Sequence, residues 1–308
     1  MPNRLTKGFR RKSQFITQAD LSGSIAYSHL GRFRAQLGAT MYSILKTVAA
    51  SMAAVLLMAT IAEAQTQTRR TTNVTPPKNI GSTSERPEFF GSATIFSDQR
   101  SQGFSSNDQD PVLQIDAGVI WRNFYFGASG SNTDLGQITV NGQSRSVGRF
   151  AVTYFAGYVN RWRNIDWDVA VSYATYPGAR DDNAELDYWE GSAGASGVLV
   201  SDLKGGLRFY WSPDYTANQG HNFVLEASLQ KPLPMIRTWK PTLELLAGHQ
   251  FGDESRGNFD YWYWEVGVAV ALNDNFSVDF RYHDTADVPI SCDRLCGPRF
   301  VASATLEY

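Results

Sequence analysis

The feature that most constrains this chain is a two-residue alternation of side-chain type, which recurs from about residue 88 to the C-terminus. Between Ile165 and Ala174, for example, every second residue is large and apolar, and the residues between them are small or acidic. Successive side chains of a β-strand point to opposite faces. The alternation therefore predicts strands that carry one apolar face and one polar face.

About twelve segments show this pattern, with lengths that suit a tilted membrane-spanning strand of about 9–11 residues. Short turns alternate with longer polar loops, as in bacterial outer-membrane barrels, which have an even number of strands and long external loops. The expected external loops lie near 99–111, 133–147, 177–187, 213–221, 251–260 and 286–298. We therefore predict an all-β fold, a transmembrane antiparallel up-and-down β-barrel, over residues 87–308. The expected strands are 88–98, 112–121, 124–132, 148–160, 165–176, 188–200, 203–212, 222–230, 240–250, 261–272, 276–285 and 299–308.

The rival fold is a soluble antiparallel β-sandwich, which would place its polar face in water and fill its inside with large apolar groups. The polar face here is rich in Gly, Ala, Ser and carboxylates, which suits a hydrated lumen better than an exterior. Aromatic residues also gather near the expected strand ends, as a girdle at the membrane interface requires. They are Trp121, Phe124, Tyr125, Trp162, Trp167, Tyr173, Tyr188, Trp189, Trp211, Trp262 and Trp264.

The N-terminal region predicts export. Residues 48–62, VAASMAAVLLMATIA, follow Lys46 and lead into Ala62-Glu63-Ala64, a small-x-small cleavage pattern. We interpret residues 41–64 as a signal peptide and residues 1–40 as an upstream extension or a misplaced start. A transmembrane anchor is the alternative, although the apolar run is short for a span of about 20 residues. Residues 65–86 are polar and contain adjacent prolines, which predicts a flexible leader.

Removal of residues 1–64 changes the charge of the chain. The whole sequence has 28 Lys and Arg residues and 30 Asp and Glu residues. The segment after residue 64 keeps 20 basic and 28 acidic residues, a net charge of −8. An acidic protein has no electrostatic reason to bind nucleic acid, and we expect no nucleic-acid partner.

Strand parity places a set of charged side chains on the polar face, which becomes the lumen of a barrel. Acidic residues outnumber basic ones there, and rings of Asp and Glu favour cations. Barrels of eight strands are filled by side chains and barrels of sixteen leave an aqueous channel, so twelve strands leave both an open pore and a plugged barrel as alternatives. The predicted lumen-facing residues are Asp98, Arg100, Asp116, Arg149, Asp166, Asp168, Glu190, Lys204, Arg208, Glu226, Glu244, Glu265, Asp279 and Arg281.

The two cysteines, Cys292 and Cys296, are separated by three residues near a chain reversal. In an oxidising compartment this spacing favours a local disulfide. A metal site that adds Asp293 is the alternative.

An enzymatic barrel would need Ser, His and a carboxylate at one membrane-facing rim. After residue 64 the chain has His221, His249 and His283, and only His249 shares a strand with outward-facing leucines. We see no matching serine, so we expect no enzyme, no catalytic residue, no metal and no cofactor. A lipid-acting hydrolase that uses His249 stays open.

The last segment alternates up to a terminal aromatic residue. Phe300, Leu306 and Tyr308 share its apolar face and resemble the C-terminal strand signal that outer-membrane barrels present to their assembly machinery. We therefore expect that machinery, outer-membrane lipids and lipopolysaccharide as partners.

Residues 97–114, SDQRSQGFSSNDQDPVLQ, resemble the opening of the barrel in the TorF-like porin family. Further similarities follow in the same order along residues 87–308: Ser131–Asp134, Tyr176–Gly178, Ser212–Tyr215 and Arg281–Thr285. Gln99 and Ser101 stand where aromatic residues are commoner in that family. The Cys292–Cys296 loop is a further departure. The resemblance implies an outer-membrane pore of unassigned solute and supplies no catalytic residue.

Together these features predict a porin-like barrel in the cell outer membrane that lets small polar solutes diffuse passively through an acidic lumen. A non-conducting structural or surface-interaction barrel is the alternative.

Overall fold

A computed structural model describes residues 86–308, except for 141–142, 180–184 and 290–291. The predictions for residues 1–40 and 41–64, and nearly all of the leader at 65–86, lie outside the described residues. Among the described residues, no helix is long and apolar enough to span a membrane.

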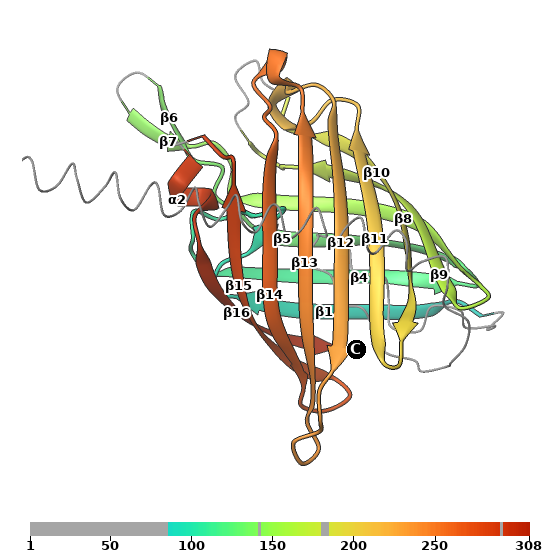
Figure 1. Cartoon of the computed structure of the whole chain (residues 1–308). Coiled ribbons are helices and arrows are strands. Elements are labelled where there is room, and N and C mark those ends of the chain that lie inside the picture. The colour runs from blue at the N-terminus through green and yellow to red at the C-terminus, as the bar shows by residue number, and fades with distance from the viewer. Residues whose placement is uncertain (1–85, 141–142, 180–184, 290–291) are drawn as a thin grey trace, which may run out of the picture. The chain divides into compact units, whose positions relative to one another are not determined.

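The described chain forms a closed antiparallel barrel (Figure 1), which confirms the predicted fold class. Its strands follow one another around the wall in sequence order, apart from two small hairpins that lie in loops. The barrel strands are β1 (Glu88–Phe96), β4 (Val112–Trp121), β5 (Phe124–Asn132), β8 (Phe150–Trp162), β9 (Ile165–Thr175), β10 (Tyr188–Val200), β11 (Leu203–Ser212), β12 (Asn222–Pro232), β13 (Lys240–Gly252), β14 (Tyr261–Ala271), β15 (Phe276–Ala286) and β16 (Arg299–Glu307).

The strand bounds agree with those expected from the alternation to within a few residues. Connections at the two ends of the barrel differ in length. The short-turn end has the links 122–123, 163–164, 201–202, 233–239 and 272–275. The long-loop end has the links 97–111, 133–149, 176–187, 213–221, 253–260 and 287–298.

Small elements lie within the long loops. The hairpin β6 (Gln137–Val140) and β7 (Gln143–Ser146) extends from the long-loop end (Figure 1). Two short 3-10 turns, η1 (Thr216–Asn218) and η2 (Glu254–Arg256), and the helical turn α2 (Asp293–Cys296) lie in later loops. The loop after β1 contains the hairpin β2 (Arg100–Ser101) and β3 (Phe104–Ser105).

The first and last strands close the barrel. β1 pairs with β16 from Ser92↔Glu307 to Phe96↔Ser303. The backbone N–H of Tyr308 donates to the carbonyl of Gly91 at 2.9 Å, and the Gly91 N–H donates back to the Tyr308 carbonyl at 3.2 Å. Along this register, closure pairs the edge backbone groups of the first and last strands, as a strand structure in hydrocarbon requires.

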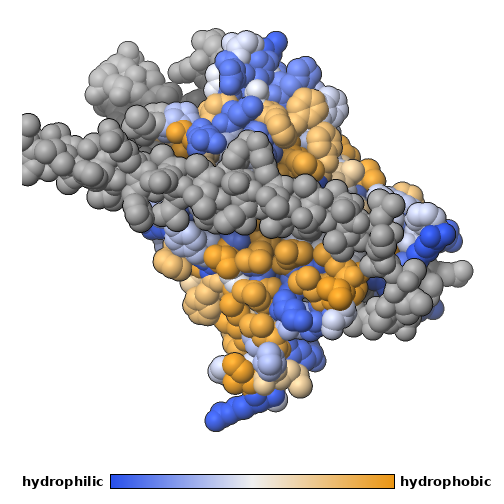
Figure 2. All heavy atoms as spheres, viewed as in Figure 1, coloured by the Kyte–Doolittle hydropathy of each residue, from blue (hydrophilic) through white to orange (hydrophobic). Residues whose placement is uncertain are grey.

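The outer wall is apolar and the inside is polar, the reverse of a soluble protein. Large hydrophobic side chains such as Phe89, Ile95 and Phe280 are 59–80% exposed. Figure 2 shows hydrophobic residues in a broad band over the barrel wall, with hydrophilic residues toward both ends. Ionisable side chains lie buried inside instead, among them Asp98, Glu226, Glu244, Glu265 and Arg281. Such a wall suits a hydrocarbon exterior.

The aromatic girdle is only partly as expected. Trp121, Phe124, Trp162, Trp167, Trp189 and Trp211 are exposed on the wall. The prediction was wrong for Tyr125, which is 1% exposed and points inward, and for Tyr188, which lines an internal cavity. Tyr125 follows the outward Phe124, and adjacent residues of one strand cannot share a face.

The β2–β3 hairpin folds into the barrel. The Phe104 ring packs against Tyr261 with centroids 5.0 Å apart, and the Tyr261 hydroxyl donates to the carbonyl of Gln102 at 2.9 Å. A Cβ at Gly103, whose φ is +88°, would lie 2.7 Å from Thr285 Cγ2. The expectation that the polar segment 99–111 is an external loop was therefore wrong for the hairpin. A polar segment fits a polar barrel interior as well as it fits bulk water.

Glycines make room for the largest inward side chains. Tyr125 lies opposite Gly157, Arg208 opposite Gly194, Tyr263 opposite Gly248 and Arg281 opposite Gly267. A Cβ at Gly157 would lie 2.2 Å from Tyr125 Cζ, and one at Gly248 would lie 2.2 Å from Tyr263 Cζ. Each large side chain therefore lies across the bare backbone of the neighbouring strand.

We predict that Gly157→Ala lowers the free energy of unfolding by about 1–3 kcal/mol, because the new methyl group overlaps the Tyr125 ring. The matched control is Gly191→Ala, where the nearest atom to a new Cβ is the Trp211 carbonyl oxygen at 3.9 Å. Urea titration of the refolded barrel in detergent, followed by its shift in gel mobility on unfolding, measures both variants. Equal midpoints for the two variants would contradict the glycine-gap interpretation.

Candidate functional site: the barrel interior

The best-connected charged group inside the barrel is Arg281 on β15. Its guanidinium lies 2.6 Å from Glu244 Oε2, 3.2 Å from Glu265 Oε2 and 2.8 Å from Asp279 Oδ2. His283 Nδ1 lies 3.3 Å from the second oxygen of Glu265. All five side chains are at most 10% exposed. One guanidinium thus holds three carboxylates that would repel one another without it. We call these five residues the Arg281 cluster.

A second buried ion pair joins β9 and β11. Arg208 Nη2 donates to Asp168 Oδ1 at 2.8 Å, and Arg208 Nη1 donates to Ser192 Oγ at 3.0 Å. The hydroxyl of Tyr125 donates to the other oxygen of Asp168 at 3.1 Å. The carboxylate is thereby neutralised and held by groups from two other strands, β5 and β11.

Glu226 on β12 is held by phenols. Tyr263 donates to Glu226 Oε1 at 2.7 Å and Tyr210 donates to Oε2 at 3.1 Å. Both tyrosines belong to a buried cluster with Val224 and Tyr261, against which Phe104 of the inward hairpin packs. The β12–β15 side of the interior is therefore filled with side chains.

The inward hairpin is anchored at both of its ends. Arg100 Nε donates to Asp98 Oδ2 at 3.0 Å, and Ser105 Oγ donates to Asp98 Oδ1 at 2.6 Å. Arg100 also donates to the carbonyl of Gly297 at 2.8 Å, just after α2. We call the hairpin residues 100–105 the plug hairpin.

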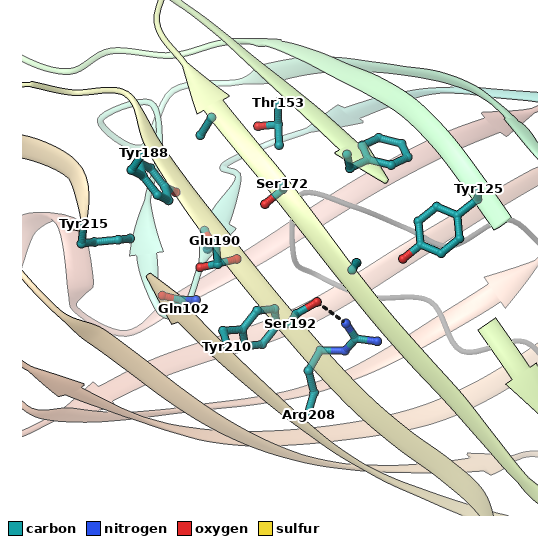
Figure 3. A pocket seen from close by; sticks show the side chains of 14 residues that line it. Gln102, Tyr125, Thr153, Ser172, Tyr188, Glu190, Ser192, Arg208, Tyr210 and Tyr215 are labelled. Carbon is teal, nitrogen blue, oxygen red and sulfur yellow. Dashed lines mark hydrogen bonds between the residues drawn. The ribbon is translucent and has the colours of Figure 1, made fainter. Parts of the chain in front are cut away.

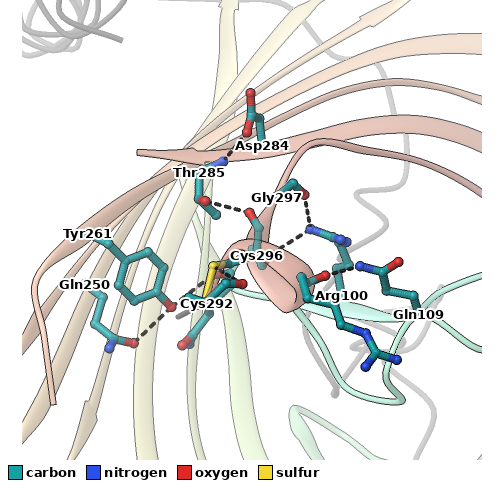
Figure 4. Close-up of a disulfide and its surroundings, with 12 residues drawn as sticks. Arg100, Gln109, Gln250, Tyr261, Asp284, Thr285, Cys292, Cys296 and Gly297 are labelled. Atoms are coloured by element: carbon teal, nitrogen blue, oxygen red, sulfur yellow. Dashed lines mark hydrogen bonds between the residues drawn. A yellow bond between two sulfur atoms is a disulfide. The ribbon is translucent and has the colours of Figure 1, made fainter. Parts of the chain in front are cut away.

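A disulfide joins Cys292 and Cys296 across α2, beside the plug hairpin (Figure 4). The carbonyl of Cys296 accepts a hydrogen bond from Thr285 Oγ1 at 2.6 Å. The disulfide turn thus presents the carbonyls of Cys296 and Gly297, which bind the barrel wall and the plug hairpin respectively.

The remaining predicted lumen residues occupy less crowded positions. Asp116 is half-buried and accepts hydrogen bonds from Ser92 and Gln114. Asp166 lies near the short-turn end, 2.5 Å from Arg161 Nε and 3.8 Å from Lys204 Nζ. Arg149 differs from the expectation: it lies in the loop before β8 and is exposed, because the strand begins at Phe150. The interior placement of Arg149 was therefore wrong.

An internal cavity of about 50 Å³ lies against β8–β11 and the plug hairpin (Figure 3). Small inward side chains on β9 and β10 leave this space; they are Ala170, Ser172, Ala174 and Ser192. The rest of the lining is larger and consists of Ser101, Gln102, Tyr125, Thr153, Phe155, Tyr188, Glu190, Arg208, Tyr210 and Tyr215. Burial and the nearby Glu190 carboxylate raise the pKa of the loop residue Tyr215 above its usual range.

The histidine considered for catalysis faces aromatic neighbours. The His249 ring lies 4.2 Å from the Phe251 ring and 4.3 Å from the Trp262 ring, centroid to centroid. The residues opposite it on β12 and β14 are Leu225 and Trp262, neither of which can act as a nucleophile. Within the described ranges, no three His, Cys, Asp or Glu side chains form a group that could hold a metal ion.

The C-terminal residues Phe300, Leu306 and Tyr308 point outward and are 79%, 58% and 94% exposed. They therefore belong to the apolar outer surface beside the β1–β16 seam. Their neighbour Thr305 points inward, where its hydroxyl lies 2.9 Å from that of Thr94.

Sequence reasoning missed several interior residues. Gln102 and Phe104 lay in a segment assigned to an external loop, and nothing in its polarity signalled the inward fold. His283 lies within the expected strand 276–285 and is absent from the predicted lumen-facing residues, yet it is 2% exposed on β15. Tyr261 and Tyr263 could have been found, because they alternate with the outward-facing residues Trp262 and Trp264.

A closed barrel with an apolar wall, a polar interior and loops of unequal length at its two ends is an outer-membrane barrel, and the outer membrane is where this chain resides. Residues 82–303 match the model of a family described as a bacterial protein of unknown function, Gcw_chp. The chain belongs to that family. No curated protein matches the sequence.

Solved porin structures are similar in fold at low identity. The KdgM porin in complex with disordered oligogalacturonate is 9% identical with a TM-score of 0.45, over 71% of this chain and 99% of that one. The NanC porin is 7% identical with a TM-score of 0.42, over the same shares of the two chains. The Salmonella typhi OmpF complex with daunomycin is 11% identical with a TM-score of 0.37, over 73% of this chain and 97% of that one.

We predict that Arg281→Ala lowers the free energy of unfolding by about 3–5 kcal/mol, because it leaves three carboxylates buried without their cation. The control is Arg161→Ala, whose ion pair with Asp166 is exposed and contributes less than about 1 kcal/mol. Denaturant titration of both refolded variants tests the difference. A loss for Arg281→Ala no larger than that of the control would show that the cluster is solvated.

Proposed function

We propose that the protein is a narrow porin-like pore through which small polar solutes diffuse passively. The observation that carries this proposal is the division of the interior. The β12–β15 side is filled by the Arg281 cluster, the tyrosines and the plug hairpin, whereas small side chains on β9 and β10 leave a polar cavity on the other side. Solutes would cross along the β8–β11 wall.

The charges of the interior support a preference for cations. Arg100 and Arg208 each pair with one carboxylate, and Arg281 pairs with three. Asp116 and Glu226 add further carboxylates on the inner wall. A wall with this excess of carboxylates would attract cations and repel anions.

The alternative is a non-conducting structural barrel. The plug hairpin favours this alternative, because it contacts the inner face of β14 and β15 directly through Gln102, Gly103 and Phe104. In that case the interior network serves only to hold the barrel closed and rigid.

Several partners follow from the outer wall and from the sequence. Outer-membrane lipids would surround the apolar wall, and lipopolysaccharide would contact its external part. We also propose that residues 41–64 direct export and that Phe300, Leu306 and Tyr308 are recognised by the barrel-assembly machinery. The ordered motifs support membership in the TorF-like porin family. We propose no catalytic activity and no cofactor.

We predict discrete single-channel currents from the refolded barrel in planar bilayers. Replacement of Arg100–Ser105 with a Gly-Ser linker of equal length should raise the conductance severalfold, because it removes the plug hairpin from the interior. If neither protein conducts at any voltage, the pore proposal is wrong. If only the linker variant conducts, the natural barrel is plugged and the structural alternative holds.

The control for the linker variant replaces residues of an external hairpin. A Gly-Ser substitution over Gln137–Val140 in β6 removes a strand pair that belongs to the separate β6–β7 sheet. It should leave the conductance unchanged. A rise in this control would mean that loop replacement loosens the barrel in general.

A further inference from the structure

The internal cavity combines one carboxyl group, that of Glu190, with several aromatic rings. Glu190 projects into it from β10, between Tyr188 and Tyr215 on one side and Tyr210 on the other (Figure 3). Among the described residues, no cation lies within ion-pair distance of the Glu190 carboxylate. The neighbouring Arg208 is already committed to Asp168 at 2.8 Å.

The tyrosine rings form a surface that attracts positive charge. Tyr188 and Tyr215 pack at 60° with their centroids 4.8 Å apart. The guanidinium carbon of Arg208 lies 5.8 Å from the centroid of Tyr210, so one ring of the lining already contacts a cation. Aromatic faces stabilise ammonium groups, most strongly where water is excluded.

The chemistry of the lining distinguishes between classes of solute. An anion would be repelled by Glu190 and by the nearby Glu226. A neutral solute could bond to Ser172, Ser192 and the phenols, but it would leave the Glu190 carboxyl without a charged partner. An organic cation would pair with the ionised Glu190 carboxylate and place its methylene groups against the rings.

The cavity volume limits the size of this solute. About 50 Å³ corresponds to roughly four water positions, since one water occupies about 10–15 Å³ on the same measure. The space therefore fits an ammonium group with a short alkyl chain.

We propose that the Glu190 cavity binds small primary alkylammonium ions. The ammonium group pairs with the Glu190 carboxylate, and the alkyl chain lies against Tyr188, Tyr210 and Tyr215. This proposal names a solute class for the proposed pore. It rests on the proposed pore function only where passage of the solute is concerned. Binding itself requires no conduction.

Isothermal titration calorimetry of the full barrel, refolded in non-ionic detergent, tests the site with propylammonium chloride. We expect saturable binding, and we expect propan-1-ol and sodium propionate to give none, because they lack the positive charge. Glu190→Gln keeps the shape of the side chain and should weaken binding at least about tenfold. Equal binding of propan-1-ol, or an unchanged affinity in Glu190→Gln, would overturn the proposal.

The control variant is Asp202→Asn, which removes one negative charge in a turn at the short-turn end, where Asp202 pairs with Lys231. It should bind propylammonium as the unmodified protein does. Should Glu190→Gln not refold, Tyr215→Leu in the loop after β11 gives a second test, with an expected severalfold loss of affinity. Retention of full affinity in Tyr215→Leu would contradict the aromatic contribution.

Bilayer recordings separate this site from the proposed function. Propylammonium on one side of a conducting barrel should reduce the current in the unmodified protein and not in Glu190→Gln. A barrel that binds propylammonium but never conducts would refute the pore and keep the site. A barrel that conducts without binding propylammonium would refute the site and keep the pore.

Discussion

The structure depends on a wall whose outer face meets hydrocarbon. Because unsatisfied polar groups in hydrocarbon cost several kcal/mol each, backbone groups must pair within a closed sheet, and charged side chains on the strands must point inward. Once inside, those charges cannot rely on bulk water alone and must be balanced by one another. The Arg281 cluster and the Asp168–Arg208 pair follow directly from this constraint.

The glycines of the wall follow from the same constraint, which directs large polar side chains into the barrel. Residues such as Tyr125, Tyr263 and Arg281 are too large to stand perpendicular to the wall beside equally large neighbours. Each lies across a glycine on the adjacent strand, which brings its polar tip to a partner on another strand. The glycine content that suggested a hydrated lumen in the sequence therefore also serves to pack a dense interior.

The sequence predicted the wall well and the interior only in part. Alternation fixed the twelve strands and their faces, because the hydrocarbon outside and the polar inside leave a period of two in every strand. Asp168, Arg208, Glu226 and Arg281 were found by this rule. The inward hairpin was not, since a polar segment such as 100–105 fits the lumen and external water equally well. Arg149 was misplaced because alternation does not define the residue at which a strand begins.

The two sides of the interior differ in a way that bears on function. On β12–β15 the inward residues are long and mutually bonded, so any movement there breaks several buried ion pairs or hydrogen bonds at once. On β9 and β10 the inward residues include alanine and serine, whose short side chains leave the cavity open. The plug hairpin contacts the filled side through Phe104 and Gly103 and reaches the cavity through Ser101 and Gln102. The filled β12–β15 side therefore holds the plug hairpin, and the tip of the hairpin borders the cavity on the β9–β10 side. In the proposed pore, a solute small enough to pass the tip would then meet Glu190, which lines the same cavity as Ser101 and Gln102.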